Sequence, residues 1–189
     1  MVRKTEYSKM GGLDDRFFAH MEEIDLCWRL QLEGKSIFVV PQSVVWHLGG
    51  GTLPNDSPWK LKLNYRNNLL MLQNNLAKTY SLQEVRELTP EKAAVKACGR
   101  ARGTIFIRMC LDGCSALAYL LTGKKDCFKA VWEAHKEFRG LGAKTDVKEI
   151  QEYADTHRRI DVPALFPEWI VPLAMLRGNG IFDYLRKLI

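Results

Sequence analysis

The sequence lacks the features that would mark an export signal or a clean membrane-spanning helix. Residues 1–6 (Met-Val-Arg-Lys-Thr-Glu) contain no apolar core of the kind that a signal peptide has. The longest apolar run, Thr104 to Thr122, is interrupted by Arg108 and Asp112. Because a spanning helix requires about 20 predominantly apolar residues, the sequence does not predict a membrane crossing.

Several sequence patterns of binding sites are also absent. The chain has no internal repeat, no P-loop or dinucleotide-binding glycine pattern, and no nucleic-acid-binding module, so no nucleic-acid partner is expected. No two cysteines form a CxxC pair, and the odd number of five favours reduced thiols in a cytoplasmic protein. The spacing of Cys110, Cys114 and Cys127 does not fit the common zinc sites. We therefore expect the cysteines to be small buried apolar residues.

What the sequence does contain is an uneven excess of positive charge. The 189 residues are 47% hydrophobic and 26% charged, which is typical of a globular protein, and the net charge is +6. Most of the excess lies in residues 97–140, whose charged residues are Arg100, Arg102, Arg108, Lys124, Lys125, Lys129, Lys136 and Arg139 against Asp112, Asp126, Glu133 and Glu137. This basic and apolar segment fits either core helices with solvated ends or a helix that lies in a membrane interface.

Residues 11–34 combine a glycine turn with several acids. Gly11 and Gly12 predict a turn, and Met21 to Glu33 predict a helix that ends at Gly34. Glu22 and Glu23 fall in the first turn of this helix, where the helix dipole favours an ionised carboxylate that could accept a proton. Asp25 and Arg29 have the spacing of a favourable helix-surface ion pair.

Further along, the pattern predicts two short strands followed by helices. The strands are Ile37–Val40 and Ser43–Trp46, and His47 follows the second one before a run of three glycines. His47 suits either a structural role or a contact with a metal or phosphate. The predicted helices run from about Trp59 to Leu76, from Pro90 onward to about Phe138, and from Asp146 to Arg159. Arg66 in the first of these is either a surface charge or a group that reaches a diphosphate.

The order of these motifs resembles glycosyltransferase family 2, and in particular its rhamnosyltransferase-like members. The motifs are Gly-Gly-Leu-Asp-x-Arg-Phe-Phe, Glu-Glu-x-Asp-Leu-Cys-x-Arg, Val-x-His, Gly-Gly-Gly-Thr and Tyr-Arg-Asn-Asn. The resemblance implies an α/β fold: the C-terminal portion of a GT-A domain in residues 1–80, and a helical, membrane-associated region in residues 81–189. It also implies a cytoplasmic protein that contacts the inner face of the membrane peripherally.

The resemblance also implies roles for individual residues. Glu23, or Glu22 beside it, would be the base that activates the acceptor hydroxyl, and His47 would help to hold Mg²⁺ or Mn²⁺. The substrate-binding residues that it implies are Gly11, Gly12, Asp25, Arg29 and Arg66. The partners would be a nucleotide-sugar donor and a glycan or lipid-linked acceptor.

One motif of that family is missing. The chain contains no Asp-x-Asp, the motif with which such enzymes hold the metal on the nucleotide diphosphate. The resemblance therefore implies the acceptor-side fragment of an inverting transferase that is inactive alone. The alternative, from another functional class, is a non-catalytic membrane-surface or interaction module.

Overall fold

The computed structural model describes residues 1–46, 57–141, 145–160 and 176–180. Over these residues the chain forms six α-helices and two short 3₁₀-helices. In chain order they are α1 (Lys4–Lys9), η1 (Asp15–Phe17), α2 (Glu22–Leu32), α3 (Pro58–Glu84), α4 (Pro90–Leu121), α5 (Lys125–Leu141), α6 (Val147–Thr156) and η2 (Gly178–Gly180).

The predicted α/β fold is wrong, because no strand occurs in the part of the chain that the structure describes. Ile37–Val40 and Ser43–Trp46, which the sequence assigns to strands, lie outside regular secondary structure and are exposed to solvent. A short apolar run becomes a strand only where another strand pairs with its backbone, and the run itself carries no information about such a partner. The chain therefore does not have the predicted portion of a GT-A domain.

The helix boundaries that rest on capping residues are confirmed. α2 covers the predicted Met21–Glu33 within one residue at each end, and Gly34 follows it with a φ of +72°. α4 begins at Pro90 directly after Thr89, because proline fits the first helical position, where no intrahelical partner for its nitrogen exists. α3 begins near the predicted residue but continues to Glu84, eight residues past Leu76.

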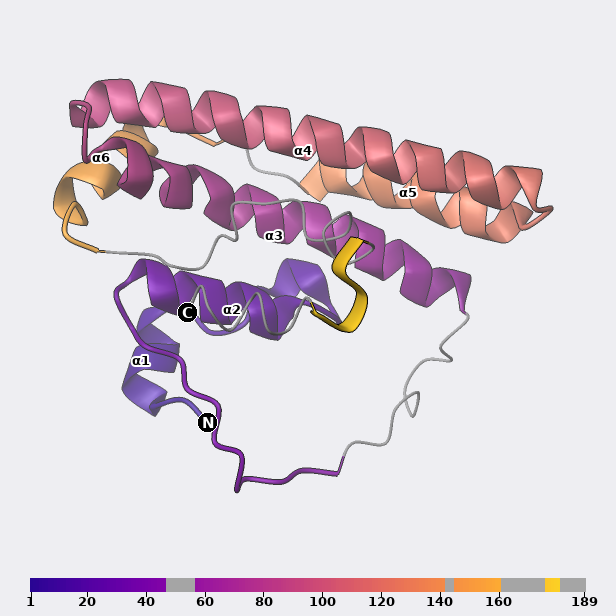
Figure 1. The fold of residues 1–189 in the computed structure, drawn as a ribbon, viewed down its shortest axis with the longest axis horizontal. Helices are drawn as coiled ribbons and strands as arrows, with labels where there is room; N and C mark the ends of the chain where they lie inside the picture. Colours follow the sequence, from indigo (N-terminus) through magenta and orange to yellow (C-terminus); the bar gives the residue numbers. More distant parts are fainter. Residues whose placement is uncertain (47–56, 142–144, 161–175, 181–189) are drawn as a thin grey trace.

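The long helix α3 is the centre of the fold. It contacts α4, α5 and α6 as well as α2 and η1, with α4 and α5 on one side and α2 on the other (Figure 1). Small side chains on α4 allow it to lie close to α3; the buried ones are Ala93, Ala94, Ala97, Cys98 and Ala101. A second core cluster joins Phe17 to Leu69 and Leu70 of α3 and Phe138 of α5.

The cysteines follow the sequence prediction only in part. All five are free thiols, and Cys98 is buried, so that desolvation raises the pKa of its thiol. Cys110 and Cys114, however, are exposed on α4. Cys27 and Cys127 are half-buried, so full burial is confirmed for Cys98 alone. The prediction is wrong for Cys110 and Cys114, because the face of α4 that carries them packs against no other described element.

Glu84 at the end of α3 gives the fold a pH-dependent contact with α4. Its carboxylate accepts hydrogen bonds from Lys96 (2.7 Å) and Arg100 (2.9 Å), and the bond from Lys96 contributes most to holding the pKa of Glu84 below its ordinary value. A lowered pKa in the folded state means that the contact stabilises the protein above the ordinary glutamate pKa. This stability is lost as the pH falls through the lowered value.

We therefore expect Glu84→Gln to reduce the free energy of unfolding by about 1 kcal/mol at pH 7. The difference in the free energy of unfolding between Glu84→Gln and the unsubstituted protein should shrink as the pH is lowered to 3. Urea unfolding at both pH values measures this, and a difference that does not change with pH would contradict the assignment.

Candidate functional site

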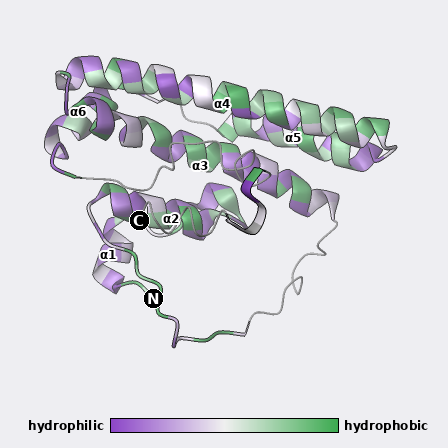
Figure 2. Cartoon of the chain, viewed as in Figure 1, coloured by the Kyte–Doolittle hydropathy of each residue, from purple (hydrophilic) through white to green (hydrophobic). Residues whose placement is uncertain are grey.

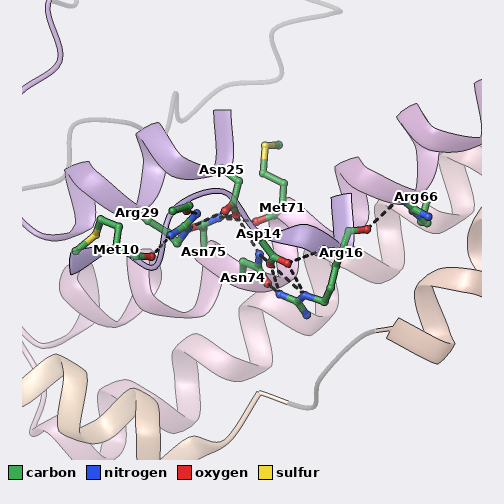
Figure 3. A network of polar contacts seen from close by, with 10 residues as sticks. Met10, Asp14, Arg16, Asp25, Arg29, Arg66, Met71, Asn74 and Asn75 are labelled. Carbon is green, nitrogen blue, oxygen red and sulfur yellow. Dashed lines mark hydrogen bonds and ion pairs between the residues drawn. The ribbon is translucent and has the colours of Figure 1, made fainter. Parts of the chain in front are cut away.

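The Gly11-Gly12 turn forms as predicted, and its carbonyl groups are bound by the protein itself. Both glycines have a positive φ, +74° and +73°. The guanidinium of Arg29 donates hydrogen bonds to the carbonyl oxygens of Met10 (2.6 Å) and Gly12 (2.8 Å) (Figure 3). A Cβ atom at Gly12 would lie 3.2 Å from the ring of Tyr7. Glycine is thus required here both by the backbone conformation and by the close packing of the turn.

Asp25 connects this turn to α3. Its carboxylate is completely buried and accepts hydrogen bonds from Arg29 (2.7 Å), Asn74 (3.1 Å) and Asn75 (2.8 Å). Arg29 in turn holds the glycine turn, so that the turn, α2 and α3 share one polar network (Figure 3). The predicted ion pair between Asp25 and Arg29 is confirmed. The role of Asp25 and Arg29 in substrate binding stays a prediction. The hydrogen bonds named above all join two groups of the protein itself.

A second ion pair, which the sequence reasoning missed, lies beside the first. Arg16 donates to both carboxylate oxygens of Asp14, with a shortest distance of 2.5 Å, and to the side-chain oxygen of Asn74 (2.7 Å). The hydrogen bond from Arg16 is the main reason why the pKa of Asp14 lies below its ordinary value. Neither partner is available as an unpaired charge for a ligand.

Arg66 is buried and binds the loop between η1 and α2. Its guanidinium donates to the carbonyl oxygen of Phe17 (2.8 Å) and to Glu137 of α5 (3.1 Å). The neighbouring Asn67 amide donates to the same carbonyl oxygen of Phe17 (3.0 Å) and to two further loop carbonyl oxygens, those of Ala19 (2.6 Å) and His20 (2.8 Å). Three loop residues that are not glycine have a positive φ: Phe18, His20 and Met21. Arg66 and Asn67 therefore hold a strained loop in place.

The predicted catalytic acids are not gathered with the other predicted site residues. Glu23 is exposed and Glu22 is half-buried. A pocket of about 410 Å³ opens beside the glycine turn, and its described lining includes Arg29 and Asn74 but neither glutamate. Their role as a base stays a prediction that no contact in the described residues supports.

The predicted metal contact, His47, lies outside the described residues. Within the described ranges, no three His, Cys, Asp or Glu side chains are placed to hold a metal ion together. The expected Mg²⁺ or Mn²⁺ therefore stays a prediction.

A different feature, the outer face of α4, stands out on the surface. Apolar residues are concentrated in its C-terminal half (Figure 2). Among the described helices, α4 alone is long and apolar enough to cross a membrane by length and composition, and only 11% of its most apolar stretch is buried. We call the exposed apolar residues of this half the α4 face: Phe106, Ile107, Cys110, Leu111, Cys114, Leu117, Ala118, Leu120 and Leu121. Exposed apolar surfaces that are contiguous mark sites of contact with a protein or a membrane.

The two charges within this half of α4 are paired with each other. Arg108 donates to Asp112 (2.8 Å), and Asp112 is buried with a second contact to His135 of α5 (3.3 Å). These charges interrupt the apolar run in the sequence, but the α4 face itself has no charged residue.

Cations border the α4 face at both ends. Before it lie Lys92, Lys96, Arg100 and Arg102, and after it lie Lys124 and Lys125, all exposed. The outer side of α5 adds further exposed cations and the indole of Trp132. The structure thus places the positive excess predicted from the sequence around an exposed apolar surface.

Comparison of the chain with protein-family models, curated proteins and solved structures finds no match. The resemblance to glycosyltransferase family 2 is wrong, because the described residues form helices without a strand and no related family, protein or structure supports it. The motif residues that suggested it instead make internal contacts, as Arg29 and Arg66 do. The sugar-transfer activity expected from the resemblance stays an untested prediction.

Proposed function

We propose that the chain is a non-catalytic membrane-surface module whose α4 face lies in the interface of an anionic membrane. The observation that carries the proposal is the uncharged α4 face with cations at both ends. Interfacial helices bury an apolar face at the boundary of the acyl chains and place lysine and arginine at the level of the lipid headgroups. Each such cation adds roughly 1 kcal/mol near a negatively charged membrane surface.

The packing of α4 favours a helix that lies in the interface over one that crosses the membrane. α4 contacts α3, α5 and α6. The outer side of α5 has charged, exposed residues, among them Lys125, Lys129, Lys136 and Arg139. A crossing would carry this neighbouring helix into the hydrocarbon, where each charge costs several kcal/mol. Burial of the α4 face alone leaves the charges of α5 in water.

The residue pattern of the α4 face also favours a membrane over a second copy of the chain. Part of the face repeats in steps of three and four, as a coiled-coil seam does: Ile107, Cys110, Cys114, Leu117 and Leu121. A soluble coiled coil has charged residues beside this seam, whereas here the flanking exposed positions are apolar: Phe106, Leu111, Ala118 and Leu120. The apolar surface is thus wider than a seam between two helices needs.

Sedimentation with lipid vesicles tests the proposal. We expect the protein to sediment with vesicles that contain phosphatidylglycerol, and to bind neutral phosphatidylcholine vesicles at least tenfold more weakly. Binding should weaken as salt rises from 0.05 to 0.5 M, because salt screens the exposed cations. Equal binding to both kinds of vesicle, or binding to neither, would contradict the proposal.

A further inference from the structure

An apolar groove of about 540 Å³ runs alongside the α4 face. Ile105, Phe106 and Met109 of α4 form one wall, and Phe138 of α5 contributes to the other side. A volume of this size lies in the range that small-molecule sites occupy. Phe106 lines the groove and is also 68% exposed. The groove is therefore continuous with the surface that we propose to lie in the membrane.

One charged side chain, Arg102, is found among the described residues that line this groove. It is exposed and lies one helical turn before Phe106. Arg102 makes no ion pair with a carboxylate in the described parts of the chain. Its positive charge acts to lower the pKa of the nearby Cys98 thiol, against the larger effect of burial. The groove thus has a cation at one end and apolar walls that extend along α4 as far as Met109. At the rise of an α-helix, Arg102 and Met109 are about 10 Å apart along the helix axis.

We propose that this groove binds one acyl chain of an anionic membrane lipid, with the phosphate of that lipid on Arg102. The proposal rests on the proposed function, because the lipid comes from the membrane that the α4 face contacts. Guanidinium groups bind phosphate through two parallel hydrogen bonds, which gives Arg102 a function that the apolar walls cannot supply. A neutral lipid would gain the apolar contacts but not this bond.

Calorimetric titration with dodecyl phosphate below its micelle concentration tests the site without a membrane. We expect one dodecyl phosphate to bind per chain and dodecyl maltoside, which has a neutral head, to bind at least tenfold more weakly. Arg102→Gln should weaken dodecyl phosphate binding about tenfold, since the paired, charged hydrogen bonds of the guanidinium to the phosphate are lost. Lys136→Gln makes the same change in net charge on α5 and should leave the affinity unchanged. Equal losses in both variants would overturn the proposal.

A second pair of variants separates the groove from the rest of the α4 face. Phe106→Ser removes one of the three side chains that form the α4 wall of the groove. Leu121→Ser removes an apolar side chain at the end of the α4 face that does not line the groove. We expect Phe106→Ser to weaken dodecyl phosphate binding at least fivefold and Leu121→Ser to leave it unchanged. Both should weaken binding to phosphatidylglycerol vesicles.

The two assays give different answers if one of the two proposals is wrong. Vesicle binding without binding of dodecyl phosphate would overturn the lipid site and leave the membrane-surface function intact. Binding of dodecyl phosphate without vesicle binding would overturn the membrane-surface function and with it the membrane as the source of the lipid. Light scattering measures whether the protein is a dimer that dodecyl phosphate separates into monomers. That result would show that the groove is an interface between copies and would overturn the lipid site.

Discussion

Replacing Asp25 by alanine is expected to lower the free energy of unfolding by about 3–5 kcal/mol. The carboxylate is completely buried and is the acceptor for Arg29, Asn74 and Asn75. Its removal leaves the partly buried guanidinium of Arg29 without a counter-charge and the amides of Asn74 and Asn75 without their shared acceptor. Removing one partner of a buried ion pair is far more costly than removing an exposed charge. The glycine turn, which Arg29 binds, should loosen with it.

Urea unfolding at pH 7 measures this effect, and Glu23→Ala is the matched control. Glu23 is on the same helix, two residues before Asp25, and is exposed. We expect its replacement to change the free energy of unfolding by less than about 0.5 kcal/mol. Similar losses in the two variants would show that the polar network around Asp25 does not hold α2 to α3.

The second large effect is expected at the α4 face. Leu117 is 57% exposed, so Leu117→Glu should leave folding unchanged but should weaken binding to phosphatidylglycerol vesicles roughly 10- to 100-fold. Burial of a leucine side chain in an apolar environment contributes about 1.5–3 kcal/mol, and the new carboxylate is repelled by the anionic surface.

The matched control for this variant is Val95→Glu on the same helix. Val95 is 59% exposed and precedes the α4 face by eleven residues. The substitution changes the net charge by the same amount, so it reports the electrostatic part of the effect alone, which we expect to be threefold or less. Vesicle binding that falls equally in both variants would contradict the assignment of the α4 face as the membrane contact.

The helices could be predicted from the sequence where a local signal marks their ends. Pro90 starts α4 and Gly34 follows α2, because proline and glycine act on the backbone conformation within one turn; the Thr89 side chain makes no capping hydrogen bond. The predicted strands failed because strand formation depends on a partner elsewhere in the chain. The apolar run Ile37–Val40 carries no information about a partner strand, and no segment among the described residues pairs with it.

The polar network could be predicted only where its partners are four residues apart, as Asp25 and Arg29 are. Asn67, Asn74 and Asn75 bind groups that lie 47 to 60 residues away in the sequence. Nothing in the local pattern distinguishes such buried amides from exposed ones. The apolar run of α4 could be recognised in the sequence. That Arg108 and Asp112 pair on the side of α5, and so leave the α4 face uncharged, could not be predicted, because it depends on the packing of the two helices.

Labelling of the native cysteines by a water-soluble maleimide tests most directly whether the α4 face contacts a membrane. Cys110 and Cys114 are exposed on this face. The internal control is Cys27, a half-buried thiol of α2, and α2 lies on the other side of α3 from α4 (Figure 1). We predict that phosphatidylglycerol vesicles slow the labelling of Cys110 and Cys114 at least tenfold and leave that of Cys27 unchanged. Labelling of Cys110 and Cys114 at the same rate with and without vesicles, under conditions where the protein sediments with them, would contradict the account.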